Sequence, residues 1–336
     1  VGGNSSLGLM YQVVDFLMRE GRSGPATAWE RSDGVKFLCP SPGYDRHFAI
    51  CEHLGIGMRA VPMTDTGPDM DVVEQLVQQD PTIKGVWCVP RFSNPTGCVY
   101  SADTVARIAR LPLAAGDHFT VLWDNAYAVH ALSDDAPQLA SISRACEEAG
   151  TGDQVIQFGS TSKISFAGGG IAFMSTGITT LSAFAAHLAF QSIGPDKVNQ
   201  LRHLRLFAGE GALARHMARH ADIIWPRFQA ILDTLEAELG GGNMGTWTRP
   251  EGGYFISFDT LPGLATEVVR LAADIGVKLT PAGATFPYGR DPLDQNIRLA
   301  PTFPDVESVK TAAEVFAVCV QLATLRRQAG DSTAPA

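Results

Sequence analysis

The sequence contains no uninterrupted apolar run long enough to cross a membrane, and its first residues show no basic segment followed by an apolar stretch. Basic side chains are in deficit, because 26 lysines and arginines face 35 acidic residues and give a formal net charge of −9. A surface with this balance disfavours binding to nucleic acids. We therefore predict a cytoplasmic protein that binds neither a membrane nor a nucleic acid.

Cysteine pairs and metal-binding motifs are missing as well. The 6 cysteines show no CxxC spacing, which predicts reduced thiols rather than a disulfide framework. Of the 8 histidines, His216 and His220 are four residues apart, but no HExxH pattern accompanies them. We expect these two to share a helix face, and we predict no metal site.

Predicted strands and helices alternate over the first part of the chain. Hydrophobic residues make up 45% of the 336 residues and charged ones 18%, as in folded proteins of two domains or one large α/β unit. Short apolar strands such as Val35–Cys39 and Phe119–Trp123 are separated by helical segments such as Met70–Gln79. This pattern predicts an α/β fold with a mainly parallel sheet and helices on both faces.

The second part of the chain has a different pattern. Lys197–Leu239 is mostly helical, with breaks expected near Gly209 and Pro226, and later strands include one predicted at Val277–Thr280. We predict three regions on this basis: a large domain over residues 1–225, a smaller C-terminal α+β domain over residues 226–330, and a disordered tail over residues 331–336.

One lysine occupies an unusual setting. Lys163 lies among small hydroxyl residues, follows a strand predicted at Gln154–Phe158, and precedes three consecutive glycines. An amine shielded from water at such a strand end can act as a nucleophile toward a carbonyl group. Ser160 and Ser162 are short donors that could bind a phosphate. The alternative is a surface lysine in a flexible loop.

Polar side chains follow two other predicted strands. Asn94 comes after the apolar strand Gly85–Val89, and Asp124 ends Phe119–Trp123 with Tyr127 three residues later. A buried carboxylate is costly unless it meets a cation, so Asp124 requires a positively charged partner. Because ligands bind along the carboxyl edge of doubly wound sheets, we expect these side chains to meet there.

Two further segments could complete a ligand site. Gly3, Asn4 and Ser5 precede a helix, whose free backbone N–H groups and dipole would attract a phosphate, although an ordinary helix cap looks the same. Tyr44 follows a Pro-x-Pro-Gly turn and could stack on a flat ligand or fill the core.

A single ligand would use all of these groups. It carries a phosphate, an aldehyde that Lys163 can condense with, and a ring nitrogen that pairs with Asp124 when protonated. Pyridoxal 5′-phosphate has these features. Ionised Asp124 would keep the ring nitrogen protonated, Asn94 and Tyr127 would hydrogen-bond the ring oxygen, and Tyr44 would stack on the ring.

These motifs resemble those of the fold-type I pyridoxal-phosphate aminotransferases of the class I/II superfamily. The resemblance is carried, in this order, by Asn94-Pro-Thr-Gly97, Asp124-Asn-Ala-Tyr127, Ser160-Thr-Ser-Lys163 and Arg298. More narrowly, three segments resemble a bacterial aspartate aminotransferase branch that is grouped with MocR-type proteins: Cys39–Phe48, Gly194–His203 and Pro281–Gly289. The similarity runs from Val1 to about Ala323.

The resemblance implies an activity and roles for residues. It implies transfer of an amino group from an amino acid, L-aspartate by family, to 2-oxoglutarate through a ping-pong Schiff-base mechanism in a homodimer. Lys163, Asp124 and Tyr127 would be catalytic. Arg298 would bind the substrate α-carboxylate with the help of Asn94, since a planar guanidinium suits that task, although a surface salt bridge is the alternative.

The residue that would bind the distal carboxylate of a dicarboxylic substrate stays open. Lys197, Arg202 and Arg205 are candidates, either within the chain or reaching in from a partner subunit. They could equally form the basic face of a helix.

Two departures from the family pattern matter. Many relatives have an arginine for the phosphate eight residues after the lysine, but Ile171 stands here. The family also has on the order of a hundred residues before the phosphate loop, so either the sequence is truncated or that stretch was not included. The alternatives are an alanine or aromatic aminotransferase, a lyase, a cofactor-binding regulatory domain, and an inactive chain that still folds.

Overall fold

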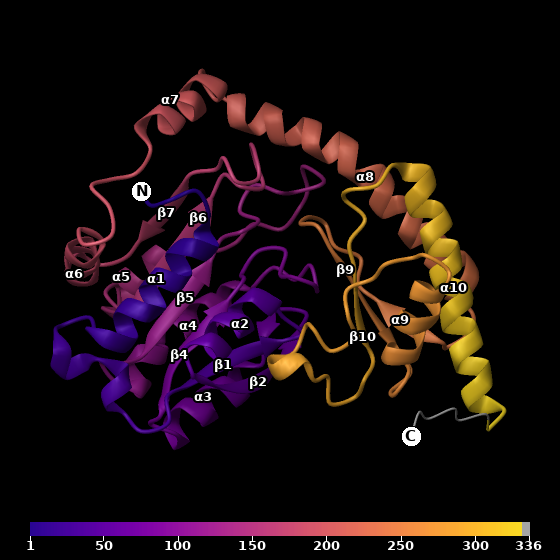
Figure 1. The fold of residues 1–336 in the computed structure, drawn as a ribbon, viewed down its shortest axis with the longest axis horizontal. Coiled ribbons are helices and arrows are strands. Elements are labelled where there is room, and N and C mark those ends of the chain that lie inside the picture. The colour runs from indigo at the N-terminus through magenta and orange to yellow at the C-terminus, as the bar shows by residue number, and fades with distance from the viewer. Residues whose placement is uncertain (331–336) are drawn as a thin grey trace.

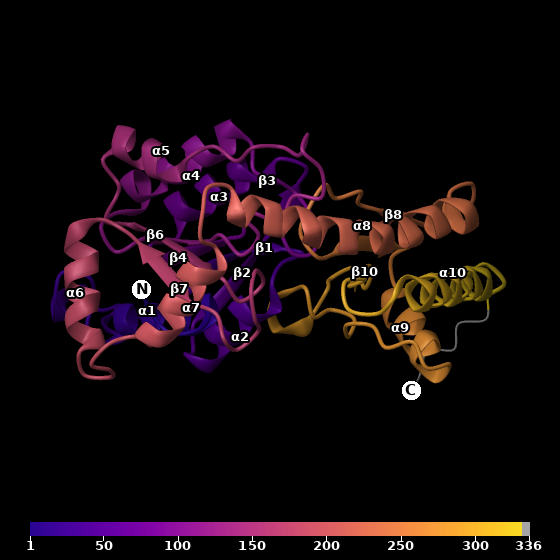
Figure 2. The same cartoon turned by 90° about the horizontal axis from the view of Figure 1, so that it is seen from above.

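The structure is a computed structural model that describes residues 1–330. The disordered tail predicted at residues 331–336 lies outside the described residues. The strands form a 7-stranded sheet and a 3-stranded sheet, each with its own helices. Figures 1 and 2 show the two sheets side by side, with α8 (Ala212–Leu239) extending from the first toward the second.

The larger sheet confirms the predicted α/β architecture. Its strand order is β3-β2-β1-β4-β5-β6-β7; the five strands from β2 to β6 pair in parallel, and β3 and β7 are antiparallel edge strands. The strands are β1 (Lys36–Ser41), β2 (Gly57–Thr64), β3 (Gly67–Pro68), β4 (Ile83–Cys88), β5 (Thr120–Asp124), β6 (Val155–Ser160) and β7 (Ala172–Ser175).

Helices cover both faces of this sheet because its central strands are apolar on both sides. Successive strand residues point to opposite faces, so Leu122 packs into one hydrophobic cluster while Val121 and Trp123 pack into the other. The first cluster includes residues of α1 (Ser6–Arg19), α2 (Asp45–His53) and α6 (Ile178–Leu188). The second includes residues of α3 (Met70–Gln79), α4 (Ala102–Ala115) and α5 (Ile142–Ala149).

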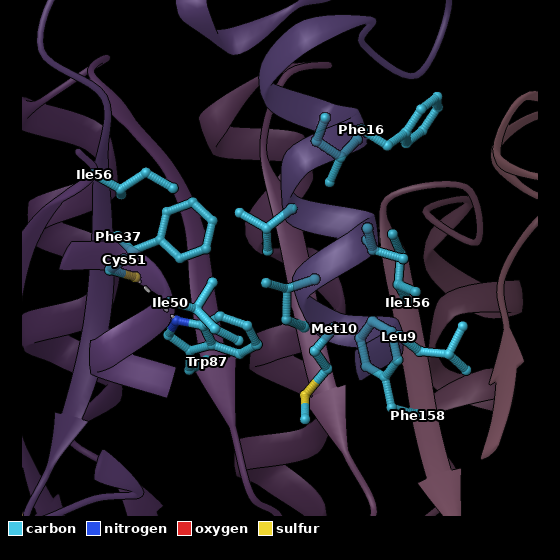
Figure 3. Packing of buried hydrophobic residues seen from close by; sticks show 14 of the residues in the cluster. Leu9, Met10, Phe16, Phe37, Ile50, Cys51, Ile56, Trp87, Ile156 and Phe158 are labelled. Atoms are coloured by element: carbon cyan, nitrogen blue, oxygen red, sulfur yellow. Dashed lines mark hydrogen bonds between the residues drawn. The ribbon is translucent and has the colours of Figure 1, made fainter. Parts of the chain in front are cut away.

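The first helix fixes the start of the chain against the sheet. Ser5 caps α1 by accepting a hydrogen bond from the Gly8 N–H, which satisfies one of the free N–H groups at the helix start. Figure 3 shows Leu9 and Met10 of α1 packed beside Ile156 and Phe158 of β6. The positive end of α1 is thereby held at the same end of the sheet as the end of β6.

The smaller sheet is antiparallel, with the order β10-β9-β8. Its helices and strands share one hydrophobic cluster, which includes the fully buried Phe228, Phe258 and Val320. The α-helices and strands after α6 are α7 (Lys197–Leu206), α8, β8 (Gly245–Trp247), β9 (Ile256–Thr260), α9 (Ala265–Asp274), β10 (Asn296–Leu299) and α10 (Val306–Gln328).

Two sequence predictions in this region are wrong. Val277–Thr280 was expected to be a strand, but these residues form no regular element and pack against the helices of the smaller sheet through Val277 and Leu279. Pro226 was expected to break the helix, yet α8 continues through it. The division into two domains at residue 226 therefore falls inside a helix and stays a prediction.

One helix within residues 1–330, α10, is long and apolar enough to cross a membrane by length and composition alone. Its apolar residues Phe316, Ala317 and Val320 are buried in the hydrophobic cluster of the smaller sheet. This burial gives the apolar composition of α10 a role in the core.

Phe258 offers a test of that core. The centroid of its ring lies 5.0 Å from that of Phe316, in an edge-to-face arrangement, and 6.0 Å from that of Trp247. We expect Phe258→Ala to lower the free energy of unfolding in urea by about 3–5 kcal/mol, since it removes a buried ring and leaves a cavity. Phe303→Ala makes the same change at an exposed position and should cost less than about 1 kcal/mol. Equal losses for the two variants would contradict this assignment of the core.

Candidate functional site

The carboxyl ends of the parallel strands gather the polar residues singled out from the sequence. Asp124 ends β5 and Ser160 ends β6. Tyr44 follows β1, and Asn94 lies in the loop after β4. The strand order reverses between β1 and β4, so the loops that leave these two strands diverge and open a crevice at this edge.

Asp124 is buried and only partly satisfied. Its Oδ2 atom lies 3.2 Å from His47 Nε2, and both side chains are 2% exposed. The His47 ring is stacked on Trp87, with 4.2 Å between ring centroids, so the imidazole is held in place. The other oxygen, Oδ1, is buried without a hydrogen-bond partner in the part of the chain that the structure describes. A buried carboxylate oxygen in this state requires a donor.

Two tyrosines adjoin this carboxylate. Burial, reinforced by the negative charges of Asp124 and Asp45, raises the pKa of Tyr44 to about 12. Burial also raises the pKa of Tyr127 above its ordinary value, and Tyr44 and Asp124 add to the effect. Both phenols therefore keep their protons at neutral pH and can donate hydrogen bonds.

Lys163 lies in the loop between β6 and β7 (residues 161–171), which we call the lysine loop. Its Nζ atom is 5.0 Å from the centroid of the Tyr127 ring. Its backbone carbonyl accepts a hydrogen bond from Tyr254 Oη at 2.9 Å and lies 3.2 Å from His130 Nε2. The lysine is therefore partly buried beside Tyr127 and is anchored through its backbone, which argues against the flexible surface loop considered from the sequence.

The N-terminal segment lies against the lysine loop. Ser162 Oγ donates to the Asn4 carbonyl at 2.8 Å, and the Asn4 side chain donates to the Gly168 carbonyl at 2.8 Å. A Cβ atom at Gly170 would lie 2.7 Å from Ser162 Oγ and 2.8 Å from the Asn4 carbonyl oxygen, so only glycine fits there. Gly3, Asn4 and Ser5 thus share one surface with the serines near Lys163.

Arg298 brings the smaller sheet into the site. From β10, its Nη1 atom donates to Asp45 Oδ1 at 2.8 Å and to Asn94 Oδ1 at 3.1 Å. The guanidinium also lies over the Phe255 ring, 5.0 Å from its centroid, and the Arg298 side chain is 11% exposed. The alternative of a surface salt bridge does not describe this largely buried arginine.

The basic residues considered for a distal carboxylate lie elsewhere. Lys197, Arg202 and Arg205 are exposed on α7. Of the three, Arg202 lines a cavity of about 340 Å³ next to Gly3, Asn4 and the glycines of the lysine loop. Within residues 1–330 none of them is hydrogen-bonded to Asn94 or Arg298.

Four residues of the site were missed in the sequence. His47 and Asp45 sit at the start of α2 beside Tyr44, and the three-residue spacing from Tyr44 to His47 was the available signal. His130 and Tyr254 had no such signal, because they meet at the Lys163 carbonyl from distant parts of the chain.

Comparison with known proteins shows which family this chain resembles in sequence. Residues 1–332 match the family model described as aspartate amino-transferase. A protein of Mycolicibacterium smegmatis that carries an aminotransferase name is 47% identical over 330 residues, which are 98% of this chain and 77% of that protein. An aspartate aminotransferase of Corynebacterium glutamicum is 42% identical over 328 residues, 98% of this chain and 76% of that protein.

Solved structures agree with the sequence comparison. The crystal structure of an aspartate transaminase from Corynebacterium glutamicum matches with a TM-score of 0.93 at 42% identity, over 97% of this chain and 76% of that chain. The structure of an aminotransferase-named protein from Corynebacterium diphtheriae matches with a TM-score of 0.92 at 43% identity, over 96% of this chain and 79% of that chain. The chain spans about three quarters of the length of these relatives.

His130 makes the stability of the fold depend on pH. Burial lowers the pKa of His130 from 6.5 to about 4, so the folded protein favours the neutral ring. The stability that the fold gains from keeping this ring neutral is complete above pH 6.5 and is lost as the pH falls toward 4. The difference between the pKa of 6.5 in the unfolded chain and about 4 in the folded protein corresponds to about 3 kcal/mol. Between pH 7.5 and 4.5, we expect the wild-type free energy of unfolding to fall by about 2–3 kcal/mol more than that of His130→Gln.

The matched control is His118→Gln, which changes an exposed histidine and should follow the wild type. Urea unfolding at the two pH values measures all three proteins. If His130→Gln lost as much stability as the wild type, the neutral buried ring would be disproved.

Proposed function

Since the chain belongs to the aspartate amino-transferase family, we propose that it is a pyridoxal 5′-phosphate-dependent aminotransferase that moves the amino group of L-aspartate to 2-oxoglutarate. The transfer proceeds in two half-reactions on one site. The observation that carries this proposal is the meeting of three groups at the carboxyl edge of the sheet: the Lys163 amine, the unpartnered oxygen of Asp124 and the Arg298 guanidinium.

The residues present fit the cofactor. Within residues 1–330, Asp124 Oδ1 is a buried acceptor that lacks a donor, and a protonated ring nitrogen would supply one. The phosphate would lie at the start of α1, where Gly3, Asn4 and Ser5 precede the free N–H groups of the helix, with Ser160 as a hydroxyl donor. The Ser162 hydroxyl donates to the Asn4 carbonyl and would have to turn from it to donate to the phosphate. Because Ile171 offers no charge, these neutral donors and the helix dipole replace the arginine of many relatives.

When bound, pyridoxal phosphate supplies an electron sink for charge that develops at the amino-acid α-carbon. Asp124, held by His47, would pair with the protonated ring nitrogen. Tyr44 would stack on the ring, and Asn94 and Tyr127 would donate to its oxygen. All of these groups would act by orientation and by electrostatics.

Lys163 holds and moves the proton. Its amine would be the nucleophile that holds the cofactor, and it would also be the base that accepts a proton from the α-carbon of the amino acid. The backbone anchor at Tyr254 and His130 keeps Lys163 close to Tyr127 while its side chain moves. A positioned base of this kind contributes roughly 100- to 10,000-fold to the rate.

Arg298 is the group that binds the substrate α-carboxylate in this proposal. Its contacts with Asn94 and the Phe255 ring hold the guanidinium at the edge of the site, where a carboxylate can pair with it. A distal carboxylate would be met by Lys197, Arg202 or Arg205, in this chain or in a partner. Preference for L-aspartate over alanine or aromatic amino acids depends on that second contact.

The homodimer is part of the same proposal. The segment from α6 to α7 carries exposed apolar side chains, among them Phe190 at 91%, Ile193 at 110% and Leu204 at 72% exposure. Apolar side chains gathered in this way are typical of protein interfaces.

Within one chain, the hydrogen bond between Arg298 and Asn94 joins the predicted small domain to the predicted large domain at the site.

The role of Lys163 is tested by absorbance. We expect added pyridoxal phosphate to produce a visible-violet band that Lys163→Ala abolishes, because the band requires the amine. L-Aspartate should convert it to the near-ultraviolet band of the aminated cofactor. Lys310→Ala, an exposed lysine on α10, is the matched control and should behave as the wild type. If the band responded to alanine or tyrosine but not to aspartate, aspartate would be rejected as the substrate and the proposed aminotransferase activity would stand.

Asp45 provides a test of the carboxylate site. Its carboxylate pairs with Arg298 where a substrate carboxylate would compete. We expect Asp45→Asn to lower the KM for the amino acid by about threefold to tenfold, with kcat little changed, since the guanidinium keeps its contacts with Thr280 and Asn94. Asp274→Asn removes the carboxylate of an exposed ion pair on α9 and should leave KM unchanged. A higher KM in Asp45→Asn would show that Asp45 supports Arg298 rather than competing for it.

A further inference from the structure

One face of α7 is polar and is turned toward the lysine loop. Asp196 caps the helix by accepting from the Asn199 N–H at 2.9 Å. Asn199 and His203 are four residues apart and therefore lie on one face. Both contact the lysine loop, whereas Leu201 and Leu204 on the other faces of the helix are exposed. Figure 1 shows α7 between α6 and α8, apart from the helices that cover the larger sheet.

Asn199 holds the glycine end of the lysine loop. Its Nδ2 atom donates to the Gly169 carbonyl at 3.0 Å and to the Gly170 carbonyl at 2.9 Å. Gly168, just before them, has a φ of +77°, a conformation that favours glycine. A glycine-rich segment loses much conformational freedom when it is fixed, so these two hydrogen bonds restrain the part of the loop that would otherwise be most mobile.

His203 holds the lysine end of the same loop. Its Nδ1 atom is 2.9 Å from the Asn199 carbonyl, which can only accept, so Nδ1 carries a proton. In the neutral ring, Nε2 is then an acceptor for the hydroxyls of Thr161 at 2.9 Å and Ser165 at 2.7 Å. Thr161 and Ser165 flank Lys163 two residues before and two residues after it. The His203 ring is 7% exposed.

The loop closes through the same threonine. Thr161 Oγ1 accepts from the Ile171 N–H at 2.8 Å, and the Thr161 N–H donates to the Ile171 carbonyl at 2.9 Å. His203 therefore contacts the hydroxyl at which the two ends of the lysine loop meet. Without that contact, Thr161 keeps its hydrogen bonds to Ile171 and Ser165 keeps those to Thr161, but neither hydroxyl is tied to α7.

We propose that Asn199 and His203 are positioning residues, and that α7 holds the lysine loop so that the Lys163 amine stays beside Tyr127. They act through the loop, because their side chains hydrogen-bond Gly169, Gly170, Thr161 and Ser165. This inference rests on the proposed role of Lys163, but the mobility of the loop can be measured without cofactor, so the two can fail separately.

Two substitutions of His203 separate positioning from helix packing. Glutamine places an amide near the position of Nε2 and can still meet Thr161 and Ser165. Asparagine places an amide near the position of Nδ1 and keeps only the contact within α7. The measurements are hydrogen exchange of the peptide that covers residues 161–171 in the cofactor-free protein, and kcat and KM in the loaded protein.

We expect His203→Asn to speed exchange in the loop about tenfold and to lower kcat about tenfold with little change in KM, while His203→Gln restores most of both. Ser165→Ala leaves α7 intact and should also speed hydrogen exchange of the loop. This variant replaces His203→Asn in the test if His203→Asn does not fold. His118→Gln is the control, because that exposed histidine is not part of the site or of α7.

The opposite ranking would overturn the proposal. If His203→Asn behaved as the wild type and His203→Gln did not, the histidine would serve only the backbone of α7. Unchanged exchange of the loop in both His203→Asn and Ser165→Ala would also overturn it, whatever the activity. Faster loop exchange in a protein that never forms the visible band would uphold the contact and reject the proposed function of Lys163.

Discussion

The proposed site depends on one buried carboxylate, that of Asp124. Asp124 ends a strand in the middle of the sheet, where water cannot solvate it, and His47 meets only one of its oxygens. Burial of such a group is unfavourable unless both oxygens find partners. The sheet, α2 and the stacked Trp87 hold the carboxylate in this position. Within residues 1–330 its second oxygen has no donor, so the edge of the sheet favours binding of a positively charged donor.

The second constraint is that the site is built from two bodies of the chain. Asp124 and Lys163 belong to the larger sheet, whereas Arg298 and Phe255 come from the smaller one. A short bridge between Ala131 and Gly252 and the hydrogen bond from Gly253 N–H to the His130 carbonyl join the two next to the lysine. The geometry of the proposed site therefore depends on how these two bodies are fixed to each other.

Local patterns predicted much of this arrangement. The strand end at Asp124 and the loop position of Asn94 after β4 could be read from apolar runs followed by polar residues, because parallel strands bring such ends to one edge. Val277–Thr280 has a strand-like composition, but it packs as an irregular segment beside its helices. His130 and Tyr254 could not have been found, since their contact with the Lys163 carbonyl joins residues 33 and 91 positions away along the chain. Tertiary packing alone creates that contact.

The anchor of the lysine backbone has a mechanical consequence. Tyr254, just before β9, donates to the Lys163 carbonyl, and His130 approaches the same oxygen from the larger sheet. Any hinge motion of the smaller sheet must either pull on that carbonyl or break its hydrogen bond. The peptide unit of Lys163 is thus the point at which a motion of the smaller sheet would reach the amine that we propose as the nucleophile.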